Sequence, residues 1–312
     1  MAEVLIVSRL LQFGAVIVVF GCGAFRIYGL GVDTAATTSA SALSSFDAWF
    51  WRVTIVGAAL ILLSGLALLL AVTANMAGSP AAAFDPDTIG TVLFDTGFGH
   101  VWCWRLLFAL LLTGACVAPL GRRRIPATLA LSLLLLVSLG WVGHAVEGQG
   151  VVRFAHEINQ MAHLLAAGLW LGGLVPLIWL LRRARRPSDP AWIAVARDVV
   201  PRFSHMGYAA VALLAGTGAI NTLLLVGSLD GLAGTPYGRL LTLKISLFLA
   251  MVAVALFNRL RLLPRLRREP QPSAPIEALA RSVLVEQALG FAVVAVVSAL
   301  GTWPPAMHHH SG

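Results

Sequence analysis

Residues Phe154–Leu181 read FAHEINQMAHLLAAGLWLGGLVPLIWLL. This stretch is longer than the roughly 20 apolar residues that a helix needs to cross a bilayer. Gly168 and Gly172 form a GxxxG step, which allows a second helix to approach closely. The stretch therefore predicts a membrane-spanning helix that packs tightly against a neighbour.

The rest of the chain has the same character. It has 312 residues, of which 58% are hydrophobic and 12% charged, and its mean hydropathy is +0.85. This composition is typical of an integral membrane protein and not of a soluble domain. We expect an all-α fold with eight transmembrane helices in one bundle, and a single membrane domain over residues 1–312. The predicted spans are 5–28, 53–77, 99–120, 126–146, 154–181, 203–226, 239–258 and 279–301.

The basic residues predict the orientation of the bundle. Nearly all are arginines, and they cluster between spans three and four, five and six, and seven and eight. By the positive-inside rule these connections face the cytoplasm, so both termini lie outside, in the periplasm. We read the arginines as topology signals and not as a nucleic-acid surface. The tail, residues 304–312, ends in a histidine run that is either a metal-capturing segment or an appended tag.

Residues 187–202 read PSDPAWIAVARDVVPR. Asp189 suits an N-cap and Pro190 suits a first helical turn. The segment predicts a short interfacial helix on the cytoplasmic surface, with a solvated linker as the alternative.

Two histidines on the fifth span form the main functional signal. His156 and His163 are two helical turns apart, so they lie within about 20° of each other on one face. An ionisable group on a membrane helix faces the protein interior or a cavity. The pair therefore predicts a site for a metal ion, a haem or a proton.

Further candidate ligands gather at the same, outer side. His100 and His144 lie toward the outer ends of spans three and four, whereas His205 lies near the inner surface. Imidazole binds copper, zinc, iron or nickel, and nearby sulfur favours copper, Cu(I) especially. The predicted metal ligands are His144, His156 and His163, with His100, Cys103 and Met161 as additions. For each residue the alternative is ordinary packing or hydrogen bonding.

Other charged groups lie inside the spans. Glu286 is about two turns from the inner end of span eight, where it could relay protons or pair with Arg52 or Arg281. His205 and Glu286 are the candidates for an inner transport path. Lys244 and Arg105 are expected to extend toward the membrane surface or to pair with carboxylates. The chain has no GxxxxGK[ST] loop, so we expect neither ATP hydrolysis nor another enzyme activity.

Several motifs together resemble the copper resistance protein D (CopD) family. They cover residues 75–303 in the family's order. They are TGFG at 96–99 with Trp102 and Arg105, HLLAAGLWLGGLVP at 163–176, TPYGRLLTLK at 235–244, NRLRLLP at 258–264, and RSV at 281–283 with Glu286.

The resemblance implies a bacterial inner-membrane protein with eight spans and periplasmic ends. It implies movement of copper, as Cu(I) or Cu(II), usually inward, with a periplasmic CopC-like copper-binding protein as partner. His144, His156 and His163 match positions expected in that family. Two alternatives stay open. One is a b-type cytochrome in which His144 and either His156 or His163 ligate haem b. The other is a copper sensor or scaffold that does not transport.

Overall fold

The computed structural model describes residues 2–31, 40–141, 150–186, 191–226 and 234–303. Within these residues the chain is helical and contains no strand. Eight helices are long and apolar enough to cross a membrane, which confirms the predicted fold class. The spans are formed by α1 (Ala2–Tyr28), α3 (Ala40–Met76), α5 (Gly97–Val117), α6 (Arg124–Ser138), α7 (Gly150–Ala167) together with α8 (Gly173–Ala184), α9 (Ala191–Val226), α11 (Pro236–Phe257) and α13 (Ser273–Leu300).

Short elements complete the bundle. Two of them are π-helical turns, η5 (Gly168–Gly172) between α7 and α8, and η6 (Asn258–Leu262) after α11. The others are α4 (Pro86–Phe94), α12 (Leu263–Arg268), and the 3-10 turns η1 (Pro80–Phe84), η2 (Gly121–Arg123) and η3 (Leu139–Trp141).

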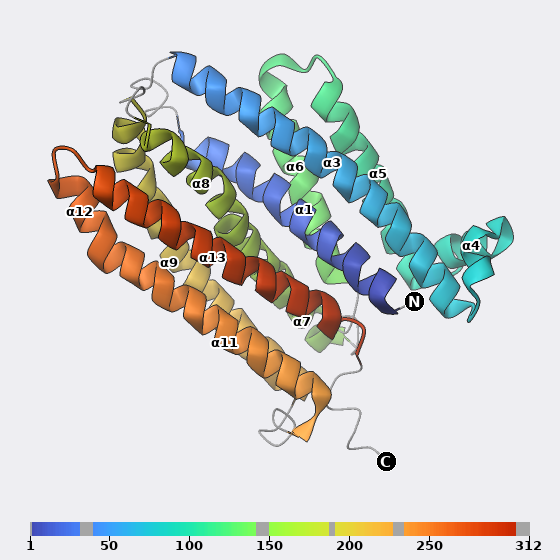
Figure 1. Ribbon diagram of the computed structural model, residues 1–312. Helices are drawn as coiled ribbons and strands as arrows, with labels where there is room; N and C mark the ends of the chain where they lie inside the picture. The colour runs from blue at the N-terminus through green and yellow to red at the C-terminus, as the bar shows by residue number, and fades with distance from the viewer. Residues whose placement is uncertain (1, 32–39, 142–149, 187–190, 227–233, 304–312) are drawn as a thin grey trace.

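The spans alternate in direction along the bundle (Figure 1). The start of α1 and the end of α13 consequently lie at one end. The arginine-rich connections α5–α6, α8–α9 and α12–α13 lie at the opposite end. The predicted orientation requires the termini and the arginine-rich connections to lie at opposite ends of the bundle, as they do here.

The fifth span, formed by α7, η5 and α8, is the centre of the bundle. In its most apolar window 67% of the residues are buried, against 11–44% for the other spans. It contacts α1, α6, α9 and α13. The side chains of this span therefore lie mostly in the interior of the bundle.

The predicted close approach of a second helix occurs at η5. A Cβ atom built on Gly172 would lie 2.1 Å from the carbonyl oxygen of Ile17 and 2.8 Å from the Cα of Gly21. Both atoms belong to the α1 backbone, which has no flexible end that could move aside. Only glycine at position 172 allows this contact, as the GxxxG pattern indicated.

Gly172→Ala should destabilise the bundle by about 1–3 kcal/mol, because the new methyl group overpacks against the α1 backbone. The matched control is Gly216→Ala on α9, where a Cβ atom would meet nothing within 4 Å. Thermal unfolding in detergent should give a lower midpoint for Gly172→Ala than for Gly216→Ala. Equal midpoints would show that the α1–η5 contact is looser than described.

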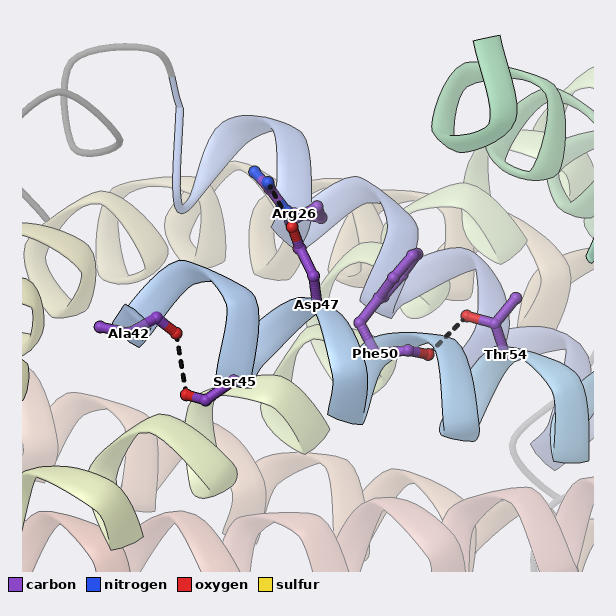
Figure 2. A network of polar contacts seen from close by, with 6 residues as sticks. All are labelled: Arg26, Ala42, Ser45, Asp47, Phe50 and Thr54. Carbon is purple, nitrogen blue, oxygen red and sulfur yellow. Dashed lines mark hydrogen bonds and ion pairs between the residues drawn. The ribbon is translucent and has the colours of Figure 1, made fainter. Parts of the chain in front are cut away.

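The second span begins earlier than predicted. Helix α3 starts at Ala40, whereas the apolar pattern placed the start at residue 53. Arg26 of α1 makes a two-pronged ion pair with Asp47 of α3, with Nε–Oδ1 at 2.7 Å and Nη2–Oδ2 at 3.2 Å (Figure 2). The Thr54 hydroxyl donates to the carbonyl of Phe50 at 2.8 Å. The ion pair with α1 thus stabilises the part of α3 that precedes residue 53.

Residues 191–202 do not form a separate interfacial helix. They are the first turns of α9, which continues through Pro201, and residues 187–190 lie outside the described residues. Trp192 is fully buried and meets Trp179 of α8 edge-on, with ring centroids 5.1 Å apart. Arg197 donates to the carbonyl of Leu266 in α12 at 3.3 Å. These contacts pack one face of the segment against α8 and α12.

Candidate functional site

A cavity of about 690 Å³ lies in the half of the bundle that contains the termini. We call it the outer cavity. Helices α1, α7, α9, α11 and α13 surround it, and its walls are mostly apolar. Its polar lining residues are Arg9, His156, Gln160, His163, Asn221, Thr222, Tyr237 and Lys244. A pocket with apolar walls and a few convergent polar groups is typical of a ligand site.

His163 is hydrogen-bonded across the bundle to α9. Its Nδ1 lies 2.8 Å from the hydroxyl oxygen of Thr217. That hydroxyl also lies 2.6 Å from the carbonyl oxygen of Leu213. When the hydroxyl donates its single hydrogen to Leu213, its oxygen accepts from Nδ1–H, and this tautomer leaves the lone pair on Nε2. A neutral imidazole with its other nitrogen fixed in this way is ready to bind a metal ion.

His156 lines the same cavity and is only 7% exposed. It lies two turns from His163, about 10 Å along the helix. The sequence prediction that both histidines face one interior site is thus supported by their common place in the cavity wall.

Amide side chains join α7 to α9 beside the histidines. Asn159 donates to the backbone carbonyl of Thr217 at 3.2 Å and to Oδ1 of Asn221 at 2.8 Å. Asn221 in turn donates to Oε1 of Gln160 at 3.1 Å. This network fixes the register of the two helices, so Thr217 stays opposite His163.

The other predicted ligands lie elsewhere. His144 is outside the described residues. His100 is exposed on α5, with Nε2 at 2.8 Å from the carbonyl of Phe94, and the sulfur of Cys103 lies 3.9 Å from the carbonyl of Leu93. Neither residue lines the outer cavity, nor does Met161. In the part of the chain that the structure describes, no group of three or more His, Cys, Asp or Glu side chains is assembled.

Glu286 on α13 is buried at 3% exposure and accepts two hydrogen bonds. The indole Nε1 of Trp170 donates to Oε1 at 2.7 Å, and Nδ2 of Asn258 donates to Oε2 at 3.2 Å. Each donor lies in one of the two π-helical turns. Such turns occur often at functional sites because the extra residue redirects side chains.

Neither arginine proposed as a partner for Glu286 contacts it. Arg281 donates to Glu277 at 2.6 Å, and Arg52 makes no ion pair with another described residue. Arg105, also expected to pair with a carboxylate, instead lies over the ring of Trp102 with its Cζ 4.3 Å from the centroid.

A second pocket, of about 80 Å³, lies in the arginine-rich half of the bundle. We call it the inner pocket. Glu286, Asn258, Ser204 and Arg259 are among its lining residues, and Trp170 lines both this pocket and the outer cavity. Trp170 is therefore part of the wall between the two spaces, and Glu286, which accepts its hydrogen bond, lines the inner pocket.

His205 is exposed beside the inner pocket. Its Nε2 lies 2.9 Å from Nη2 of Arg259, and because guanidinium can only donate, this nitrogen is the acceptor. Arg259 also donates to the hydroxyl of Ser204 at 3.3 Å. The Nε2 lone pair of His205 is thus occupied in this state.

Comparison with known proteins agrees with the motif pattern. Residues 1–154 match the family model for the copper resistance protein D-like N-terminal domain, and residues 197–300 match that for copper resistance protein D. The inner membrane protein YebZ of Escherichia coli is 32% identical over 301 residues, which cover 96% of this chain and 98% of YebZ.

Two other relatives are named as copper proteins. Copper resistance protein D of Pseudomonas syringae pv. tomato is 28% identical over 304 residues, covering 96% of this chain and 94% of the relative. The copper transport protein CutJ of Bacillus subtilis is 29% identical over 250 residues, covering 77% of this chain and 44% of CutJ. No solved structure matches the chain. With eight spans and matches to both family models, the chain belongs to the copper resistance protein D family.

Proposed function

We propose that this chain is a multi-pass inner-membrane protein that binds copper in the outer cavity and moves it across the membrane. The observation that carries the proposal is His163, an imidazole whose Nδ1 is bonded to Thr217 and whose Nε2 is left to bind a metal ion. The names of the relatives support copper as the substrate, and that of YebZ supports the inner membrane as the location.

In this proposal His156 and His163 are the copper ligands, and His144 supplies a third imidazole. Imidazole suits both Cu(I) and Cu(II). His156 is nearer the start of α7 and His163 is deeper, so the ion would pass from the first to the second by ligand exchange. His100, Cys103 and Met161 stay predictions as additional ligands, and copper titration of their alanine variants tests them.

The proposed direction of movement is inward, and the charge distribution supports the orientation that this requires. The outer cavity lies in the half of the bundle away from the arginine-rich connections, and by the positive-inside rule that half faces the periplasm. Copper would arrive there from a periplasmic CopC-like donor. It would leave through the inner pocket after the Trp170–Glu286 hydrogen bond opens, with Glu286 and His205 along the route.

The test of the function is copper uptake in cells that lack their own copper importers. Expression of the chain should raise the copper content of the cytoplasm, measured by mass spectrometry after periplasmic extraction. An unchanged cytoplasmic copper content, with the protein present in the membrane, would contradict transport.

Thr217→Val should weaken copper binding about tenfold, because groups that orient a metal-bound histidine typically contribute 10–100-fold in affinity. Valine keeps the shape of threonine but cannot accept from Nδ1–H of His163. Competition with a chromophoric Cu(I) chelator measures the affinity. Thr217→Ser keeps the hydroxyl and should bind like the unchanged protein. Tight binding by Thr217→Val would remove the argument for the His163 tautomer.

A further inference from the structure

The outer cavity is lined by cations and, among the described residues, by no carboxylate. Arg9 of α1 and Lys244 of α11 both line it together with the two histidines. Arg9 donates through Nη1 to the carbonyl of Gly301 at 2.6 Å, while its buried Nε has no hydrogen-bond partner. No hydrogen bond or ion pair joins the Lys244 ammonium to another described residue. Lys244 and His163 line the same cavity.

These charges conflict with a bare copper ion as the bound species. Like charges that share a partly buried cavity repel one another more strongly than in water, because the effective dielectric constant there is only about 20. A site built for a free cation would carry carboxylates or no charge in this position. In addition, an unpaired ammonium inside a membrane protein is costly and calls for a counter-charge.

We propose that copper enters the outer cavity as an anionic complex, with Lys244 and Arg9 as the counter-charges. This inference rests on the proposed function, since it names the form in which that substrate arrives. A Cu(I) ion with two anionic ligands, such as chloride or thiolate, carries one negative charge. The cavity, at about 690 Å³, has room for such a complex, whereas a single ion would fill only a small part of it.

The cavity would recognise the complex in two ways, with imidazoles for the copper and cations for its anionic ligands. An imidazole of His156 or His163 replaces one anionic ligand on copper while the other anion stays bound, and no electron transfer is involved. The released anion leaves toward the periplasm. The cations thus attract the incoming complex and stabilise the anion that stays on copper.

The test compares Lys244→Met with Lys244→Arg in purified protein that is competed against a Cu(I) chelator in chloride buffer. Lys244→Met should bind Cu(I) at least about fivefold more weakly, because it removes one attractive charge. Lys244→Arg keeps the charge and should bind as the unchanged protein does. In perchlorate buffer of equal ionic strength, where Cu(I) is not an anionic complex, the loss in Lys244→Met should disappear.

The outcomes separate the two proposals. Tighter or unchanged Cu(I) binding by Lys244→Met in chloride would overturn the anionic-complex proposal and leave copper transport standing. Weak binding by both Lys244→Met and Lys244→Arg would show an amine ligand and would also overturn it. Absence of Cu(I) binding by the unchanged protein would overturn the proposed function, and this inference with it.

Discussion

The double variant His156→Ala, His163→Ala should lose copper affinity by more than about 100-fold, because groups that merely orient such ligands already contribute 10–100-fold. Both side chains line the outer cavity, so their removal enlarges a space that already exists. The fold should therefore survive, and the thermal midpoint in detergent should change little. Cu(I) competition measures the affinity directly.

The matched control is His205→Ala. His205 is a histidine on a membrane helix but lies outside the outer cavity, next to Arg259. It should keep the copper affinity of the unchanged protein. If the double variant and the control bound copper equally well, the outer cavity would not be the copper site.

Glu286→Gln should slow copper transport at least about tenfold, an effect of ~1.4 kcal/mol on the barrier. Glutamine keeps the shape and can still accept from Trp170, so the wall between the two spaces stays closed. It has no negative charge, however, and cannot attract a cation from the outer cavity into the inner pocket. Copper affinity at the outer cavity should stay within about twofold, since the histidines are unchanged.

Uptake of copper by proteoliposomes measures this rate. The control is Glu277→Gln on the same helix, where the carboxylate pairs with Arg185 and Arg281 at the surface. Glu277→Gln should transport copper normally. Equal rates for the two variants would exclude Glu286 from the path and leave its hydrogen bonds a purely structural role.

Hydropathy located all eight spans because a membrane helix needs a long apolar run whatever its neighbours are. It placed the helix starts at 53 and 203, too late by several turns, because charged residues interrupt the apolar runs in the added turns: Asp47 and Arg52 in α3, and Arg197, Asp198 and Arg202 in α9. Those turns are stabilised by tertiary contacts such as Arg26–Asp47 and Trp179–Trp192. A sequence pattern does not contain such contacts.

The candidate site could likewise be predicted only in part. Helical periodicity alone predicts that His156 and His163 share a face, and both line the outer cavity. Thr217 and Asn221 were missed, although two polar residues four apart in an apolar span are a usable signal of an interior contact. That Thr217 faces His163 depends on which helix packs against α7. The same holds for Trp170 and Glu286, which are far apart in sequence and meet where the fifth span packs against α13.

The most direct measurement is the metal content and optical spectrum of protein purified without added metal and lacking residues 304–312. The account predicts copper at about one atom per chain, as expected for one copper site with imidazole ligands, and no Soret band. It predicts that this copper is lost in the His156→Ala, His163→Ala variant. Iron with a Soret band would contradict the account and make the chain a b-type cytochrome. Copper retained by the variant would contradict the site.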